Sequence, residues 1–198
     1  MPSTPGCARR AGAGAMSEPA ATGRLPQVPR EAVDDSALIE VLDAAERLST
    51  PKPAWYLTLA HDPQMAVGYA RFWDLTHRGG RVEHTTKELM RIAIAQLMGC
   101  DFCAEQRSVK ALDEGLSEDD AMACAMPDFN HPDARVRAAL RYARALVLDG
   151  PGDDGSRFDE VYRELRSVFD DGEVVELGCF AAIAIGGVKL SPSLQIDP

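Results

Sequence analysis

This sequence of 198 residues has few cysteines and no long uninterrupted apolar run. Five cysteines are a sparse and odd-numbered set, which does not suit the disulfide framework of a small secreted protein. The most apolar stretch, 177–188, is shorter than the roughly 18 to 20 residues that a membrane-spanning helix needs, and glycines interrupt it. Arg9 and Arg10 are not followed by the apolar segment of a secretory signal. We therefore expect a cytoplasmic protein.

Basic residues are also scarce, because 21 Lys and Arg stand against 31 Asp and Glu, for a net charge of −10. The first 33 residues hold four arginines and two glutamates, which leaves the remainder near −12. Nucleic acids and anionic membranes are bound through clustered Lys and Arg. This charge balance predicts that neither is a partner.

The length favours one main domain, and 45% hydrophobic residues with 26% charged residues are typical of a globular chain. Residues 1–33 are rich in Ala, Gly, Pro, Ser and Thr without a helical period, so we predict a flexible N-terminal leader followed by a single helical domain over 34–198. Met16 is an alternative start site within this leader.

Apolar residues recur at helical spacing in most of the remaining chain. Ser36 has the position of a helix cap, Asp62-Pro63 reads as N-cap and first helical residue, and Gly99 and Gly115 are expected helix ends. No strand-like alternation of useful length is found. The pattern predicts an all-α fold of about seven or eight helices, expected over 36–50, 63–77, 85–98, 100–114, 132–148, 158–169 and 173–189, with a further helix that starts at Ser117.

Cys100-Asp-Phe-Cys103 is a C-x-x-C motif at a predicted helix start, where backbone N–H groups favour a thiolate. Two such cysteines can exchange between dithiol and disulfide. A zinc site is disfavoured because a second C-x-x-C or an H-x-x-x-H spacing is missing. A structural pair of small buried side chains remains an alternative.

The run from Glu88 to Cys103, Glu-Leu-Met-Arg-Ile-Ala-Ile-Ala-Gln-Leu-Met-Gly-Cys-Asp-Phe-Cys, resembles the core of the alkylhydroperoxidase D-like branch of the carboxymuconolactone decarboxylase family. The resemblance implies an all-helical homo-oligomer, a trimer or a multiple of it, with thiol peroxidase or disulfide-reductase activity and no metal or organic cofactor. It also implies that Cys103 attacks the peroxide and Cys100 resolves.

The family pattern continues with a histidine four residues after the second cysteine, and here that position is Arg107. In the family, Glu and His form a proton relay to the thiol. Arginine cannot shuttle protons because it stays protonated, although its charge can lower the pKa of a nearby thiol. We expect Arg107 to form a salt bridge with Glu88 across an antiparallel helix pair. Glu88 is also placed to complete a capping box with Thr85.

Several further residues have two interpretations. His77 and His84 flank a Gly-Gly turn and could supply the missing base, although loop histidines are common. Gln96 is a candidate polar group on an apolar face, where a hydrogen-bonded core role is more usual. Cys124 and Cys179 lie in apolar helical stretches and are expected to be inert, and Cys7 falls in the leader. Aromatic residues that could line a small-molecule pocket, or simply pack in the core, are Trp55, Tyr56, Phe72 and Trp73.

The sequence thus predicts a peroxiredoxin-type thiol oxidoreductase with antioxidant activity, acting on a peroxide or disulfide and regenerated by a thiol reductant that the sequence does not identify. A catalytically silent oligomer that binds a small molecule or protein is the first alternative, and the missing histidine favours it. Lactone decarboxylation is the second, disfavoured because such enzymes generally lack the C-x-x-C.

Overall fold

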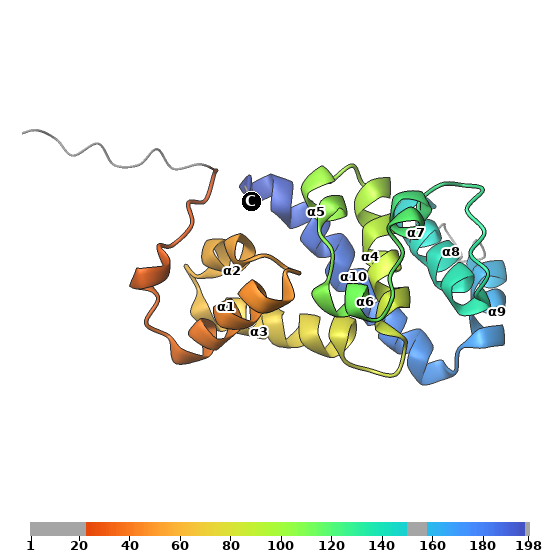
Figure 1. The fold of residues 1–198 in the computed structure, drawn as a ribbon, viewed down its shortest axis with the longest axis horizontal. Coiled ribbons are helices and arrows are strands. Elements are labelled where there is room, and N and C mark those ends of the chain that lie inside the picture. The colour runs from red at the N-terminus through yellow and green to blue at the C-terminus, as the bar shows by residue number, and fades with distance from the viewer. Residues whose placement is uncertain (1–22, 150–157, 197–198) are drawn as a thin grey trace, which may run out of the picture.

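The computed structural model describes residues 23–149 and 158–196, and within these ranges every regular element is a helix (Figure 1). This confirms the all-α prediction. The elements are η1 (Arg30–Ala32), α1 (Ser36–Leu48), α2 (Pro53–Leu59), α3 (Pro63–Trp73), η2 (Asp74–Arg78), α4 (His84–Leu97), α5 (Asp101–Glu105), α6 (Val109–Asp113), α7 (Glu118–Ala123), α8 (Ala134–Leu148), α9 (Asp159–Val168) and α10 (Asp171–Leu194).

Side-chain caps explain where several helices begin. Asp62 accepts a hydrogen bond from the Met65 N–H at the start of α3, as its Asp-Pro signature predicts. Asp170 and Glu173 form a complete capping box at α10. The cap of α1 is Asp35, whose carboxylate accepts from the Leu38 N–H, so the prediction of a Ser36 cap was one residue late.

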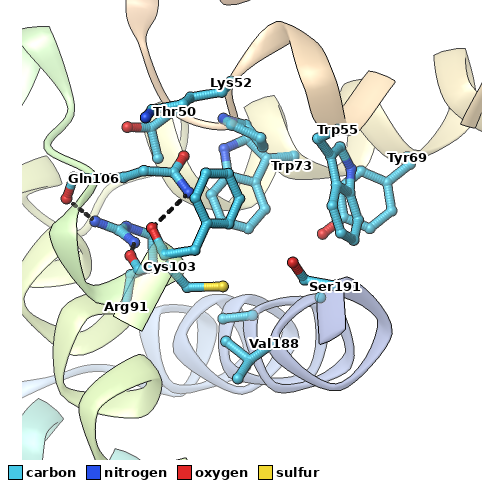
Figure 2. Close-up of a pocket in the computed structure, with 14 residues that line it drawn as sticks. Thr50, Lys52, Trp55, Tyr69, Trp73, Arg91, Cys103, Gln106, Val188 and Ser191 are labelled. Atoms are coloured by element: carbon cyan, nitrogen blue, oxygen red, sulfur yellow. Dashed lines mark hydrogen bonds between the residues drawn. The ribbon is translucent and has the colours of Figure 1, made fainter. Parts of the chain in front are cut away.

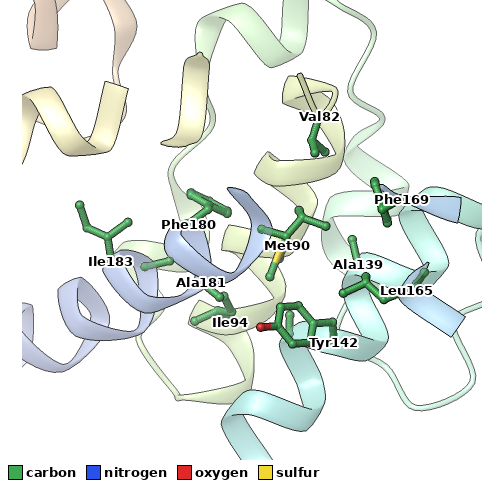
Figure 3. Close-up of a cluster of buried hydrophobic side chains, with 14 of the residues drawn as sticks. Val82, Met90, Ile94, Ala139, Tyr142, Leu165, Phe169, Phe180, Ala181 and Ile183 are labelled. Carbon is green, nitrogen blue, oxygen red and sulfur yellow. The ribbon is translucent and has the colours of Figure 1, made fainter. Parts of the chain in front are cut away.

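Helix α4 is the centre of the fold, and 11 of its 14 residues are buried. One side of α4 packs with α8, α9 and α10 in the largest hydrophobic cluster, where Met90 and Ile94 lie against Phe180 and Ala181 (Figure 3). Another side meets α6, α7 and α8 through Leu89, Ile92 and their neighbours. Each fully buried apolar side chain of this kind contributes about 1.5–3 kcal/mol to the stability of the fold. Helix α4 is therefore stabilised by packing on several sides.

A separate hydrophobic cluster joins α1, α2 and α3 at one end of the molecule, where Figure 1 shows them in orange to yellow. Leu38, Leu42 and Trp55 belong to it, and Ile196 after the end of α10 closes it. Residues 50–52 before α2, together with residues of α2 and α3, line a pocket whose other walls are formed by α4, α5 and α10.

Helix α10 has 24 residues and is long and apolar enough, by length and composition alone, to cross a membrane. The sequence prediction stopped this helix near residue 189. In the structure α10 packs against α4, α8, α9 and η2, and Leu177, Phe180 and Ala181 are fully buried. This packing matches the core helix of a folded domain.

Part of the predicted leader packs against the body. Val28 donates its N–H to the Leu57 carbonyl and contributes to the α1–α3 cluster, and Arg24 donates its N–H to the Leu194 carbonyl. Val28 and Val33, which lie within the predicted leader, are thus partly buried against the α1–α3 cluster. Residues 1–22, with Cys7 and Met16, lie outside the described residues.

Candidate functional site

The two cysteines of the C-x-x-C motif form a disulfide. Gly99 takes a left-handed conformation (φ +69°) after α4, which a glycine adopts without strain, and turns the chain into α5. Cys100 is the N-cap of α5, and its sulfur accepts the Cys103 N–H at 3.3 Å. The Cα atoms of Cys100 and Cys103 are 5.3 Å apart. The predicted redox-capable pair is thus in place at the start of a helix.

A cavity of about 50 Å³ lies beside the disulfide, and Cys103 is part of its wall. Figure 2 shows the Cys103 sulfur pointing toward the space between α10 and the aromatic side chains of α2 and α3. The lining residues are Thr50, Pro51, Lys52, Trp55, Tyr69, Trp73, Arg91, Phe102, Cys103, Gln106, Ala184, Gly187, Val188 and Ser191. Trp55 and Trp73, two of the predicted pocket residues, line this cavity, whereas Tyr56 is buried elsewhere and Phe72 is partly exposed.

Aromatic packing shapes one wall of this pocket. The Trp55 and Tyr69 rings are 5.1 Å apart, and the Tyr69 and Trp73 rings stack at 6.3 Å. Gly187 on α10 leaves room for this arrangement, because a Cβ at that position would lie 2.8 Å from the Tyr69 hydroxyl. This part of the pocket wall therefore requires glycine at position 187, opposite the Tyr69 side chain.

Glu88 lies fully buried behind the pocket. Its carboxylate accepts hydrogen bonds from His77 Nε2 at 2.8 Å, from Arg91 Nε and Nη2 at 2.9 Å each, and from the Ser108 N–H at 2.8 Å. Burial alone would raise the pKa of Glu88, but the charge of Arg91 and the hydrogen bonds from His77 and Arg91 outweigh burial and hold that pKa well below its usual range. Glu88 is therefore a carboxylate, and the described residues fill its acceptor positions.

Arg91 connects this buried carboxylate to the cysteine segment. Its guanidinium donates to the backbone carbonyls of Cys103 and Gln106 as well as to Glu88. Arg91 is nearly fully buried, and all of its nitrogens donate to named acceptors. It holds the backbone of Cys103 in one position relative to α4, which makes it a positioning residue for the thiol. Arg91 was not among the predicted site residues, although its i, i+3 spacing from Glu88 is typical of an ion pair.

The predicted continuous helix from Cys100 to Gly115 is interrupted. Gln106 and Ser108 have extended backbone between α5 and α6, with ψ values of 143° and 124°. This interruption frees the Gln106 carbonyl for Arg91 and the Ser108 N–H for Glu88. The buried Glu88–Arg91 pair needs these backbone partners, so tertiary contacts override the helical pattern here.

The predicted Glu88–Arg107 salt bridge was wrong for the same reason. The extended segment sends Arg107 to the surface, where Nε and Nη2 pair with Glu118 at 2.9 and 2.7 Å. Arg107 also donates to the Ala104 and Gln106 carbonyls. The predicted Thr85–Glu88 capping box is also absent, because α4 starts at His84 and Glu88 turns into the interior.

His77 reaches Glu88 because the end of α3 continues as a π-helical turn, η2, which the sequence analysis read as ordinary helix. The ring is fully buried between Trp73, His84 and Phe180. Burial lowers the pKa of His77 to about 4, and the hydrogen bond to Glu88 only partly opposes this effect. His77 is therefore neutral and donates from Nε2 to the Glu88 carboxylate.

His84 completes the network at the start of α4. Its Nδ1 faces the His77 carbonyl at 2.9 Å, and its Nε2 faces the Ser108 hydroxyl at 2.8 Å. Burial lowers the pKa of His84 as well. Both histidines that the sequence suggested as substitute bases thus belong to the Glu88 cluster, and within the described residues both are bonded to protein groups.

Cys124 and Cys179, the remaining cysteines of the described residues, are not part of the disulfide. Cys124 is buried and its sulfur faces Gln96 Oε1 at 3.6 Å, while burial raises the pKa of the Cys124 thiol to about 12. Gln96 donates to the Ala121 carbonyl, which is the hydrogen-bonded core role that the sequence favoured. Cys179 is half-buried and free. In the described part of the chain, His, Cys, Asp and Glu side chains form no group of three that could hold a metal ion.

The fold and the site together define a class of all-helical proteins with a C-x-x-C disulfide that follows a helix carrying a buried glutamate. Residues 63–145 match the model of the carboxymuconolactone decarboxylase family. This match confirms the resemblance to that family.

Solved structures share the fold at low sequence identity. The apo debrominase Bmp8 superposes with a TM-score of 0.70 at 19% identity, over 90% of this chain and 92% of that one. The alkylhydroperoxidase D core of an uncharacterized peroxidase-related protein from Ralstonia eutropha JMP134 gives 0.69 at 17% identity, over 89% and 92%. A cysteine-to-alanine variant of the same debrominase, in complex with 2,3,4-tribromopyrrole, gives 0.69 at 19% identity, over 91% and 93%.

Two uncharacterized proteins from strains of Mycobacterium tuberculosis are similar in sequence, each 36% identical over 119 residues. The match covers 59% of this chain and 39% of each relative, so the chain spans about two fifths of the length of the curated relatives it matches.

Proposed function

We propose that this protein is a thiol oxidoreductase that cycles Cys100 and Cys103 between dithiol and disulfide while it reduces a small apolar peroxide or disulfide. One observation carries the proposal: Cys103 is both half of the disulfide and part of the wall of an aromatic pocket. A substrate in that pocket reaches a sulfur whose partner lies three residues away.

With a peroxide, the Cys103 thiolate attacks the terminal oxygen, the O–O bond breaks, and the rest of the substrate leaves as an alcohol after taking a proton. Cys103 is then a sulfenic acid. The Cys100 thiol attacks this sulfur and expels water, which forms the disulfide. The roles of the two cysteines follow the family pattern, and the position of Cys103 on the pocket wall supports them.

The pocket favours a carbon-rich substrate over hydrogen peroxide. Trp55, Tyr69, Trp73 and Phe102 surround the space with ring carbons. Buried polar atoms on lining residues, the Trp55 and Trp73 indole nitrogens and the Gln106 amide oxygen, have no hydrogen-bond partner in the described part of the chain. A substrate with an oxygen-containing head group on an apolar body would suit such walls.

The proposed reaction runs without the proton relay of the family. Glu88 is already occupied by His77, Arg91 and Ser108, and Arg107 pairs with Glu118. Protons then come from water, and the rate of substrate reduction depends on the fraction of Cys103 that is present as thiolate. Disulfide exchange needs less proton transfer than peroxide cleavage, so we expect it to be the faster of the two reactions.

The test is a thiol count on the reduced protein before and after one equivalent of cumene hydroperoxide, with 3-nitrobenzyl disulfide as a second substrate. We expect two thiols per chain to be lost, and we expect Cys100→Ser and Cys103→Ser to abolish disulfide formation. Cys179→Ser is the matched control, because Cys179 is free and outside the pocket. If the thiols stay reduced for many minutes and still react with an alkylating agent, the proposal is refuted. The catalytically silent oligomer that binds a small molecule or protein would then be the better explanation.

A second candidate is reductive dehalogenation of an aromatic ring. The debrominase shares the fold, and the aromatic pocket beside Cys103 is the feature of this chain that favours the idea. The thiolate would take the halogen, Cys100 would displace halide to form the disulfide, and the ring carbon would take a proton from water. Release of bromide from 2,3,4-tribromopyrrole by the reduced protein tests it, and an unchanged bromide concentration over a full thiol oxidation assay rejects it.

The homo-oligomer that the family resemblance implies also remains a proposal. Met65, Phe72 and Leu75 lie along α3 and its extension, and they expose 64%, 41% and 65% of their surface. Such a row is a candidate interface between copies. Light scattering measures the mass, which we expect to be a multiple of the 21.4 kDa chain.

A further inference from the structure

The two sulfurs of the disulfide border different hollows of the protein. Cys103 lines the aromatic pocket, whereas Cys100 lines a wider surface groove of about 520 Å³. Phe102 and Ser191 line both hollows and form the wall between them. The remaining groove residues are Gly23, Gly99, Asp101, Pro192, Gln195 and Ile196.

From this separation we infer that a small thiol reductant, neutral or positively charged, enters by the groove and attacks Cys100. The inference rests on the proposed thiol chemistry and adds a second site to it. Substrate and reductant would approach the same disulfide from opposite sides of the Phe102–Ser191 wall. Neither would have to leave before the other binds.

The bond changes follow from this placement. A thiolate of the reductant attacks Cys100 Sγ, the Cys100–Cys103 bond breaks, and Cys103 leaves as a thiolate on the pocket side. A second thiol of the reductant then attacks its own sulfur in the mixed disulfide and releases the Cys100 thiolate. Two electrons pass to the protein, the two thiols supply two protons, and the reductant ends as a disulfide. Cys103 is then a thiolate beside the empty substrate pocket.

Charge decides which thiols suit the groove. Asp101 is exposed, directly follows Cys100, and is the one charged residue among the groove residues in the described chain. Arg24 follows Gly23 in the chain, and its guanidinium donates to the Ser193 carbonyl. An anionic thiol must approach Cys100 past the Asp101 carboxylate, whereas a cationic one is attracted to it. A unit charge about 4 Å away in water changes a rate by roughly fivefold.

The position of attack is tested on the oxidised full-length protein without any peroxide. The protein is mixed with cysteamine, quenched with acid after a few seconds, alkylated with N-ethylmaleimide and sequenced by tandem mass spectrometry. We expect cysteamine on Cys100 and maleimide on Cys103, with the reverse product at least about tenfold less abundant. Cysteamine found on Cys103, or on both residues equally, would overturn the inference.

The groove is tested with three small thiols of different charge, cysteamine, 2-mercaptoethanol and 3-mercaptopropionate, compared at equal thiolate concentration. We expect the rate of disulfide reduction to fall in that order, and Asp101→Asn to reduce the spread between the first and last by roughly 25-fold, because these two thiols differ by two unit charges and each changes the rate roughly fivefold. Glu105→Gln is the matched control, since Glu105 is the exposed acid at the other end of α5 and lies outside the groove. An unchanged spread in Asp101→Asn would place the reductant elsewhere.

These experiments separate the two proposals. Attack on Cys100 with no reaction toward peroxide or disulfide substrates would keep the reductant groove and refute the oxidoreductase cycle. Substrate reduction with attack on Cys103 would do the opposite.

Discussion

Two arginines near the cysteine pair show how differently the same side chain can be used. Arg91 is buried on α4 and binds Glu88 together with two backbone carbonyls, whereas Arg107 lies between α5 and α6 and pairs with the exposed Glu118. Glu118 exposes 60% of its side chain, so water screens that pair, while the carboxylate of Glu88 has no contact with solvent. The site is therefore organised by the arginine that precedes the cysteines, and the one at the family's histidine position is peripheral.

The largest expected effect comes from removing the buried arginine. Arg91→Met would leave the Glu88 carboxylate buried without its main counter-charge and should lower the free energy of unfolding by about 3–5 kcal/mol. Arg107→Met is the matched control and should cost less than about 1 kcal/mol. Urea unfolding followed by circular dichroism measures both. Equal losses in the two variants would contradict the contrast drawn above.

A pH titration should reveal the buried histidine. The pKa of His77 falls from 6.5 to about 4 on folding, so the unfolded chain binds protons more readily between these values. Stability should be full above pH 6.5 and decrease as the pH falls toward 4, by up to about 3 kcal/mol. The lowered pKa of Glu88 adds a loss below its unfolded value of 4.5, in the same direction.

The histidine contribution can be isolated with His77→Gln, which keeps a hydrogen-bond donor for Glu88. Its stability should fall less between pH 6.5 and 5 than that of the starting protein, and the slope that remains comes from His84, whose pKa is also lowered by burial. His61→Gln is the control, because His61 lies at the surface and bonds to the Pro26 carbonyl. If His77→Gln keeps the slope of the starting protein, another group is responsible.

The exposed pair should be weak. Glu118→Gln removes the partner of Arg107 and should change the free energy of unfolding by about 0–1 kcal/mol, with the difference shrinking at 1 M salt. Thermal unfolding at low and high salt measures it. A loss of several kcal/mol that salt does not reduce would mean that this pair is buried in the assembled protein.

The smallest effect is expected from restoring the family residue. A working relay is worth roughly 10²- to 10⁴-fold in rate, yet Arg107→His should raise peroxide reduction by less than about threefold. The acceptor positions of Glu88 are already filled, and position 107 is connected to Glu118 at the surface. Single-turnover oxidation of the reduced variant measures the rate, and a gain of two orders of magnitude would show that the relay can be rebuilt.

Local signals predicted much of the fold. Asp62-Pro63, Gly99 and Gly115 mark helix limits through local backbone chemistry, and all three stand where expected. The disulfide of Cys100 and Cys103 also follows from their spacing and the turn before them. Such features involve residues near each other in the chain, which a single sequence displays.

Long-range contacts were harder to predict. The break at residues 106–108 exists because Glu88 and Arg91 need backbone partners from a segment some twenty residues away. Helical periodicity does not show this requirement, so the predicted Glu88–Arg107 salt bridge assumed a continuous helix that the structure does not have. The π-helical turn that carries His77 is hidden for the same reason, since its residues have an ordinary helical composition.

Gly187 and Tyr69 face each other across the pocket wall, and they differ in which substitutions they allow. Any side chain there would run into the Tyr69 hydroxyl, whereas a smaller side chain at Tyr69 would release space next to Trp55 without disturbing α10. The pocket can therefore be widened at Tyr69 on α3, whereas position 187 on α10 accepts no side chain. A protein engineer seeking activity on bulkier compounds would randomise position 69, keep the glycine, and leave the buried polar cluster untouched.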